Sequence, residues 1–405
     1  MSERKKVVLA YSGGLDTSVI LKWLELKGYD VVAFVADIGQ KDDLSVLEEK
    51  AKASGATEFY IGDLKEEFVR DFVFPAIQFN ALYEGRYLLG TSLARPAITK
   101  GLVEIAHKTG AKYIAHGATG KGNDQVRFEL SAAALDPDIE SIVPWRDPEF
   151  FNLIKGRVEA MDFAAKHNIP VKATLKKPWS SDENALHISF EAGILEDPAT
   201  TPPHDMFEYS VSPKDAPDKA EVIELTFEKG IAVKLDGITL SPYNMLKTLN
   251  DIGGRNGVGR VDMVESRYVG MKSRGVYETP GGAILMAAHR DLEGLTLEGG
   301  VIQLKETMMP RFAQLAYAGY WFTSEMDCLI ALLKESQKFV NGTVKLELYK
   351  GNITILSRSS EDSIYNFKVV SMDDDGGAYN PTYATGFIKL HAIPLVANAR
   401  RKKKK

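Results

Sequence analysis

A pair of glycines between a short apolar strand and a helix constrains this chain more than any other feature. Residues 7–11 read Val-Val-Leu-Ala-Tyr, which predicts a buried strand, and Ser12, Gly13 and Gly14 follow as a turn. From Leu15 to Leu24 apolar side chains recur at helical spacing. A glycine turn that opens a helix exposes backbone N–H groups at the positive end of the helix dipole. The segment therefore predicts an anion-binding loop.

The surrounding residues predict an α/β domain. Further strands are expected at 30–36, 59–61, 113–116 and 139–143, with helices near 44–51, 64–82 and 95–108 between them. Strands that alternate with helices form a parallel sheet with right-handed crossovers. We therefore expect a doubly wound parallel sheet, as in nucleotide-binding domains, over residues 1–172.

The remainder of the chain has a different pattern. Strands are expected at 222–228 and 231–235, a helix from Ser241-Pro242 to Gly253-Gly254, mostly helix over 301–338, and a hairpin at 344–349 and 353–356. The proline-rich segment 196–218 is expected to be a long loop. This α+β pattern predicts a second domain over 173–360, followed by a C-terminal segment over 361–405.

Composition limits the partners of the chain. Lys and Arg number 50 against 55 Asp and Glu, and the six residues Arg400–Lys405 are all basic, so the rest carries a net charge of −11. A chain with this net negative charge is unsuited to binding nucleic acid phosphates.

No apolar run approaches the roughly 20 residues of a membrane span, and the N-terminus has no signal-peptide pattern, so a cytoplasmic location is expected. The basic tail is expected to be a disordered end. Cys328, the single cysteine, excludes a disulfide within the chain and a cysteine-based zinc site, and is expected in the core.

The string Ser-Gly-Gly-Leu-Asp-Thr-Ser at 12–18 lacks the lysine of a Walker loop. On its own it could be a tight turn in which Ser12 caps the helix. In full, it resembles the phosphate loop of the PP-loop ATP pyrophosphatases. Further strings resemble the argininosuccinate synthases within that superfamily, namely 87–96, 116–130, 178–184 with 187–189, 257–260 and 271–280.

This resemblance implies a reaction. ATP would adenylate L-citrulline with release of pyrophosphate, and L-aspartate would then displace AMP to give argininosuccinate. ATP would be a substrate with Mg²⁺ carried by the nucleotide, no metal would be held by the protein itself, and the chain would be a homotetramer.

The polar segment Thr119–Arg127 follows the fourth strand, so it is expected beside the phosphate loop at the carboxyl edge of the sheet. The resemblance assigns ATP to Ala10, Tyr11, Ser12, Gly13, Gly14, Leu15, Asp16, Thr17, Ser18, Ala36 and Gly117. It assigns citrulline to Tyr87, Ser92, Asn123, Arg127, Ser180, Ser189, Glu265 and Tyr277, and aspartate to Thr119, Asn123 and Asp124. The expected catalytic residues are Ser12, Asp16, Asp124 and Arg127.

The sequence leaves several alternatives open. The chain could be another PP-loop enzyme, such as an adenylating amidotransferase or a tRNA-modifying enzyme, or a nucleotide-binding relative without catalysis. Thr91 and Arg95 could help to hold substrate carboxylates. His116 ends a strand beside the site and could act as a general base, although the resemblance does not require it.

Overall fold

The structure is a computed structural model that describes residues 4–41, 43–170, 177–373 and 376–404. The chain divides into two compact units, Met1–Asp362 and Ser363–Lys405. The domain boundary expected after residue 172 lies outside the described residues.

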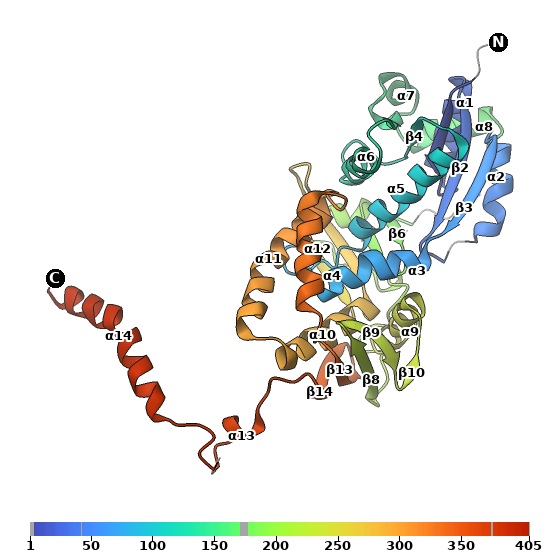
Figure 1. Ribbon diagram of the computed structural model, residues 1–405. Helices are drawn as coiled ribbons and strands as arrows, with labels where there is room; N and C mark the ends of the chain where they lie inside the picture. Colours follow the sequence, from blue (N-terminus) through green and yellow to red (C-terminus); the bar gives the residue numbers. More distant parts are fainter. Residues whose placement is uncertain (1–3, 42, 171–176, 374–375, 405) are drawn as a thin grey trace. The chain divides into compact units, whose positions relative to one another are not determined.

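The N-terminal part of the first unit contains the predicted parallel sheet. Its strands are β1 (Lys6–Ala10), β2 (Asp30–Asp37), β3 (Glu58–Asp63), β4 (Tyr113–Ala115) and β5 (Glu140–Ile142), in the order β3-β2-β1-β4-β5 (Figure 1). All four strand pairs are parallel. The strand order reverses between β1 and β4, and ligands bind at the carboxyl ends of strands at such a switch point.

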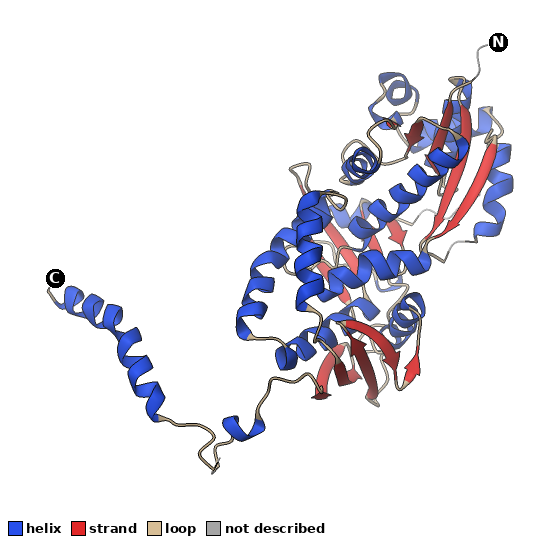
Figure 2. Cartoon of the chain, in the orientation of Figure 1, coloured by secondary structure: helices blue, strands red, loops and turns tan. Residues whose placement is uncertain are grey.

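Helices cover both faces of this sheet (Figure 2). Val7 and Leu9 pack with α1 (Leu15–Leu26), α2 (Leu47–Ala53), α7 (Pro148–Leu153) and α8 (Arg157–Lys166). Val8 and Val32 pack with α5 (Gly90–Thr109) and α6 (Asp124–Leu135) on the opposite face. The alternation follows from the two-residue period of a strand.

One predicted helix is interrupted. The expected helix over 64–82 consists of α3 (Lys65–Phe68), a π-turn at Val69–Val73 and α4 (Phe74–Gln78). The wide turn ends just before Pro75, which has no N–H to donate to a regular turn. Phe68, Phe72 and Phe79 are buried, as expected of a core helix.

Two antiparallel sheets follow in the same unit. The smaller has the order β11-β12-β7-β6 and consists of β6 (Ser180–Glu183), β7 (Ile188–Glu191), β11 (Arg260–Ser266) and β12 (Lys272–Glu278). The larger has the order β10-β9-β8-β13-β14 and consists of β8 (Glu221–Glu228), β9 (Ile231–Leu235), β10 (Ile238–Thr239), β13 (Gly342–Tyr349) and β14 (Asn352–Ser359). The predicted strands at 222–235 and the hairpin at 344–356 are confirmed.

Four helices accompany these sheets: α9 (Pro242–Arg255), α10 (Pro280–Thr296), α11 (Gly299–Ala318) and α12 (Ser324–Ser336). Short 3-10 turns lie at Leu44–Val46, Pro144–Arg146, Gly193–Glu196 and His204–Met206. The Ser241 hydroxyl accepts from the N–H of Asn244, which confirms the predicted start of α9. The expectation for Cys328 is wrong, because this residue lies on an exposed position of α12.

The second unit contains α13 (Phe367–Val370) and α14 (Thr382–Lys403). The expectation that residues 400–405 are a disordered end is wrong for Arg400–Lys403, which continue α14. None of the described residues of α14 is buried. Among the described residues, no helix is both long and apolar enough to cross a membrane.

Candidate functional site

The phosphate loop joins β1 to α1. Gly14 is the N-cap of α1, with φ −69° and ψ 171°, and Asp16 lies in the first turn. The Ser12 hydroxyl accepts from the N–H of Gly14 at 3.4 Å and contacts the Thr17 hydroxyl at 3.1 Å. No side chain caps this helix within the described residues, so its first N–H groups are available to an anion.

The loop conformation depends on Gly13. Its φ is +72°, a region that favours glycine, and a Cβ atom there would lie 2.3 Å from Leu47 Cδ2. The ammonium group of Lys50 donates to the Gly13 carbonyl. The α2 helix therefore supports the loop from the side, with Leu47 in contact and Lys50 as a hydrogen-bond donor.

A cavity of about 640 Å³ opens over this loop, and we call it the nucleotide cavity because the family resemblance assigns ATP to residues that line it. Of the residues assigned to ATP, it is lined by Ala10, Tyr11, Ser12, Gly14, Leu15, Asp16, Thr17, Ala36 and Gly117. Gly13 and Ser18 do not line it. Ser18 is buried, and its hydroxyl bonds to the Gly14 carbonyl at 2.8 Å and to the Tyr11 hydroxyl at 3.0 Å. Ser18 therefore supports the loop from behind.

A second cavity of about 270 Å³ adjoins the first, and we call it the amino-acid cavity because the family resemblance assigns citrulline and aspartate to residues that line it. Of the residues assigned to the amino acids, it is lined by Tyr87, Thr119, Asn123, Asp124, Arg127, Ser189, Glu265 and Tyr277. Five residues line both cavities: Arg95, Gly117, Ala118, Asp124 and Asp182. The two spaces are therefore contiguous at the carboxyl end of β4.

Ion pairs connect the walls where the cavities meet. Asp124 Oδ1 lies 2.7 Å from Arg127 Nη1, and Asp124 Oδ2 lies 2.9 Å from Arg95 Nε. Arg95 also reaches Asp182 Oδ2 at 2.8 Å, so it links α5 and α6 to β6. Burial alone would raise the pKa of Asp124, but the two guanidinium groups lower it below its ordinary value. Asp124 therefore stays ionised at neutral pH.

The antiparallel sheet supplies the opposite wall. Tyr277 on β12 donates from its hydroxyl to Glu265 Oε2 on β11 at 2.8 Å, and Ser189 on β7 lies opposite Tyr277 in the sheet. The ring of Tyr87 stacks on Tyr277 with centroids 4.4 Å apart. Burial raises the pKa of Tyr87 to about 12, so its hydroxyl remains protonated.

Two buried histidines lie near the site and are neutral. His187 contacts the Thr91 hydroxyl at 3.0 Å, and burial lowers its pKa to about 3. His116 stacks on Phe128, and burial lowers its pKa to about 4. His116 is not among the residues that line either cavity, which disfavours a role as general base.

Two other assigned residues lie apart from the amino-acid cavity. Ser92 is fully buried on α5, and its hydroxyl has no hydrogen-bond partner among the described residues. Ser180 is exposed on β6 and lines a neighbouring cavity of about 480 Å³ together with Thr119.

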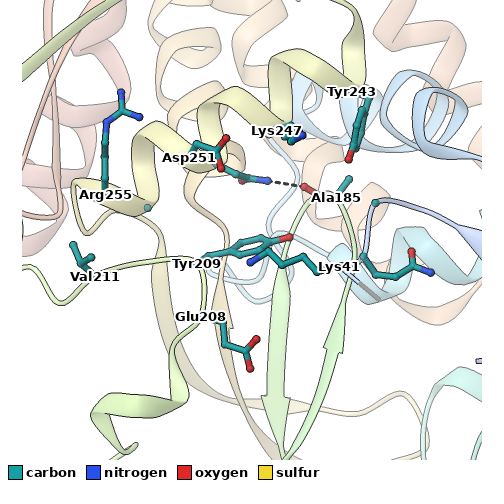
Figure 3. A pocket seen from close by; sticks show the side chains of 13 residues that line it. Lys41, Ala185, Glu208, Tyr209, Val211, Tyr243, Lys247, Asp251 and Arg255 are labelled. Carbon is teal, nitrogen blue, oxygen red and sulfur yellow. Dashed lines mark hydrogen bonds between the residues drawn. The ribbon is translucent and has the colours of Figure 1, made fainter. Parts of the chain in front are cut away.

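A further cavity of about 490 Å³ lies beside the nucleotide cavity and shares Gln40 and Glu208 with it (Figure 3). Lys41 lies over the Tyr209 ring, and Asn250 of α9 donates to the Ala185 carbonyl at 2.7 Å. This cavity contains no residue of the phosphate loop or of Thr119–Arg127. The candidate site is therefore the pair of contiguous cavities.

Several residues of this site are not predicted from the sequence. Asp182, Glu191, Arg267 and Gly275 line the amino-acid cavity. Asp182 falls within the string 178–184 that carries the family resemblance, so its presence there was the available signal. Thr91 and Arg95, for which the sequence allows a role in holding substrate carboxylates, also line the cavity.

A parallel sheet with a glycine-rich phosphate loop after β1 and an ionic cavity beside it defines a PP-loop-type nucleotide-binding protein. Comparison with known families agrees. The arginosuccinate synthase N-terminal HUP domain matches residues 6–170, and the C-terminal domain of the same family matches residues 179–398.

Relatives match over nearly the whole chain. An argininosuccinate synthase of Thermotoga sp. (strain RQ2) is 54% identical over 405 residues, covering 99% of each chain. One of Syntrophus aciditrophicus (strain SB) is 56% identical over 399 residues, covering 98% of this chain and 99% of the relative. A solved structure, described as a predicted subunit of tRNA methyltransferase from Methanocaldococcus jannaschii, has a TM-score of 0.28 at 17% identity and covers 40% of this chain and 75% of its own. That likeness is too low to support an inference. The chain belongs to the argininosuccinate synthase family and is a ligase.

Proposed function

We propose that this enzyme condenses L-citrulline with L-aspartate at the expense of ATP, as part of arginine biosynthesis. The observation that carries the proposal is the junction of the two cavities, where Arg95, Gly117 and Asp124 line both spaces. A nucleotide held by the phosphate loop and an amino acid held in the ionic cavity would meet there. Such an arrangement suits transfer of the nucleotide's adenylyl group to a second substrate.

The chemistry requires activation. The ureido carbon of citrulline is a poor electrophile, because two nitrogens donate electron density to it. In the first step the ureido oxygen attacks the α-phosphorus of ATP, and the bond to pyrophosphate breaks. In the second step the aspartate amine attacks the ureido carbon, and the C–O bond breaks to release AMP.

We assign the substrates to the residues as the family resemblance implies. ATP contacts the phosphate loop, Ala36 and Gly117. The Ser12 hydroxyl donates to the phosphates during transfer, and the Asp16 carboxylate helps to place the metal-bound nucleotide. The residues that hold citrulline are Tyr87, Ser92, Asn123, Arg127, Ser180, Ser189, Glu265 and Tyr277. Aspartate is held by Thr119, Asn123 and Asp124. The placement of the assigned residues along the two contiguous cavities, with the exceptions of Gly13, Ser18, Ser92 and Ser180, supports this assignment.

Mg²⁺ accompanies the nucleotide in this proposal. The nucleotide cavity presents the Asp16 carboxylate beside the phosphate loop, which suits a metal-bound triphosphate. No cluster of three or more His, Cys, Asp or Glu side chains suited to a metal occurs in the described part of the chain. In this proposal the Asp16 carboxylate would orient the ion together with the phosphates that it accompanies.

We also propose a homotetramer, as the family resemblance implies, and the exposed apolar side chains of α14 support association with further copies of the chain. A division into domains at 1–172, 173–360 and 361–405 is part of the proposal, and the bounds of the two matched family domains support the first boundary. A cytoplasmic location remains a prediction.

The test is a pyrophosphate-release assay in which ATP, citrulline and aspartate are omitted in turn, together with citrulline labelled with oxygen-18 in its ureido group. We expect AMP formation to require citrulline and aspartate, and the label to appear in AMP. Label in inorganic phosphate, with ADP as co-product, would contradict the proposed order of bond breaking.

A further inference from the structure

One buried tyrosine outside the amino-acid cavity contacts two charged residues of its wall. Tyr317 lies in the last turn of α11, is 1% exposed, and is not among the residues that line the cavity. Its hydroxyl donates to Glu265 Oε1 at 2.6 Å, and its backbone carbonyl accepts from Arg127 Nε at 2.8 Å. A single residue therefore bonds directly to both an anion and a cation of the site.

The Glu265 carboxylate is fixed by two tyrosines. Tyr277 donates to Oε2 at 2.8 Å, and Tyr317 donates to Oε1. The terminal torsion of a glutamate has a broad energy profile, so one hydrogen bond leaves the carboxylate plane free to rotate. A second donor on the other oxygen fixes that plane, and the lone pairs that remain can accept from a ligand.

Arg127 is fixed by the same residue through different atoms. Besides the bond to the Tyr317 carbonyl, its guanidinium carbon lies 4.9 Å from the centre of the Tyr317 ring. The end of α11 lies close against α6, because a Cβ atom at Gly319 would be 2.7 Å from Arg127 Cα. The guanidinium therefore has little freedom to move relative to Tyr317.

Tyr317 itself is held rigidly. Its ring stacks on Tyr83 with the two planes 2° apart, and Tyr87 packs edge-on at 6.2 Å. Burial, together with the negative charge of Glu265, raises the pKa of Tyr317, so its hydroxyl stays a donor at neutral pH.

We propose that Tyr317 is a positioning residue that sets the geometry between Glu265 and Arg127, and through it the affinity of the site for the zwitterionic substrate. An amino-acid zwitterion needs an acceptor for its ammonium group and a donor for its carboxylate. Glu265 and Arg127 supply one of each. This inference rests on the proposed function, in which both residues hold citrulline.

The test is Tyr317→Phe, which removes the hydroxyl and retains the ring and the backbone carbonyl. Because hydrogen bonds to charged groups are among the stronger ones, we expect the KM for citrulline to rise about tenfold or more. The KM values for ATP and aspartate should stay within about twofold of wild type. The matched control is Tyr83→Phe. Tyr83 stacks on Tyr317, and its hydroxyl donates to the Ser266 carbonyl and not to Glu265, so its loss should change the citrulline KM by less than about twofold.

A double-mutant cycle distinguishes this mechanism from a general loss of packing. If Tyr317 acts through Glu265, then adding Tyr317→Phe to Glu265→Gln should raise the citrulline KM much less than it does in the wild-type background. Any of three results would overturn the inference. They are a wild-type citrulline KM in Tyr317→Phe, an equal rise of the citrulline KM in Tyr83→Phe, and full additivity of the effects of Tyr317→Phe and Glu265→Gln on that KM. Failure of the proposed function would be distinguishable, because the wild-type enzyme would then release no pyrophosphate with citrulline.

Discussion

At the scale of single residues, Asp124 illustrates how one carboxylate can organise two neighbours. The family resemblance assigns Asp124 to aspartate and Arg127 to citrulline. The structure pairs them directly and adds Arg95 on the other carboxylate oxygen. Asp124 is half-buried, and removal of its charge leaves the guanidinium group of the buried Arg127 uncompensated. Loss of Asp124 should therefore disturb both arginines, and its effect would not be confined to aspartate.

The two glycines of the phosphate loop should respond differently to alanine. Gly14 has φ −69°, and a Cβ atom there would meet only the Ser12 hydroxyl, at 3.4 Å. Gly14→Ala should therefore preserve the free energy of unfolding, while the methyl group in the nucleotide cavity raises the Kd for a non-hydrolysable ATP analogue by about tenfold or more. Isothermal titration with a non-hydrolysable ATP analogue and urea unfolding measure the two effects.

Gly13→Ala is the matched comparison. The φ of +72° at Gly13 and its contact with Leu47 predict a loss of stability of about 1–3 kcal/mol. Equal stability of the two variants would contradict this reading of the loop.

The buried imidazole of His116 predicts a pH dependence of stability. Its pKa is lowered from 6.5 to about 4, so the unfolded chain binds a proton between these pH values that the folded chain does not. The free energy of unfolding should fall as the pH decreases through this range, by about 3 kcal/mol from this residue. His116→Phe, which keeps the stack on Phe128, should remove that part of the dependence in urea unfolding at pH 7, 5.5 and 4.5.

The control for this experiment is His204→Phe, which removes an exposed imidazole and should leave the pH dependence unchanged. If the free energy of unfolding depends on pH in the same way in wild type and in His116→Phe, then other titratable groups account for that dependence. Loss of turnover in His116→Phe at unchanged stability would restore the general-base hypothesis.

At the scale of elements, the limits of sequence reasoning follow from how each part of the site is assembled. The phosphate loop and Thr119–Arg127 are continuous segments that follow β1 and β4, so the strand–helix pattern alone predicts that they meet. Ser189 and Tyr277 meet because β7 pairs with β12, and Glu265 joins them from β11. Such non-local pairing leaves no periodic signal in the sequence, and the four residues of β7 are too few to show alternation.

The β12 strand supports a further prediction through Gly275. A Cβ atom at Gly275 would lie 2.2 Å from the Tyr277 hydroxyl, on the same face of the strand. Gly275→Ala should therefore displace that hydroxyl from Glu265 and raise the KM for citrulline by roughly fivefold to fiftyfold, because a hydrogen bond to a charged group is weakened. Steady-state kinetics with citrulline as the varied substrate measures this.

Gly294→Ala is a suitable control, since a Cβ atom there would contact nothing within 4 Å. It should leave the kinetics unchanged. A Gly275→Ala enzyme with a wild-type KM would show that Tyr277 can shift without loss of the citrulline site.

At the scale of the whole molecule, the second unit lacks a core of its own. All its described helical residues are partly or fully exposed, and α14 exposes large apolar side chains, among them Phe387, Leu390 and Leu395. An isolated helix with apolar side chains on several faces is marginal in water and gains its stability from packing. The sequence could not predict α14, because the basic end and low amphipathicity resemble a solvated tail.

Assembly should therefore depend on the apolar side chains of α14. We expect the wild-type protein to have a mass near four times 44.7 kDa in light scattering coupled to size-exclusion chromatography. Leu390→Glu with Leu395→Glu should lower that mass, because burial of each leucine contributes about 1.5–3 kcal/mol and a buried carboxylate adds a desolvation cost. Lys389→Glu places the same charge on the same helix without removing an apolar side chain, so it should retain the wild-type mass. An unchanged mass in the double variant would mean that α14 is not part of the interface, and the apolar surface of this helix would then need a different partner.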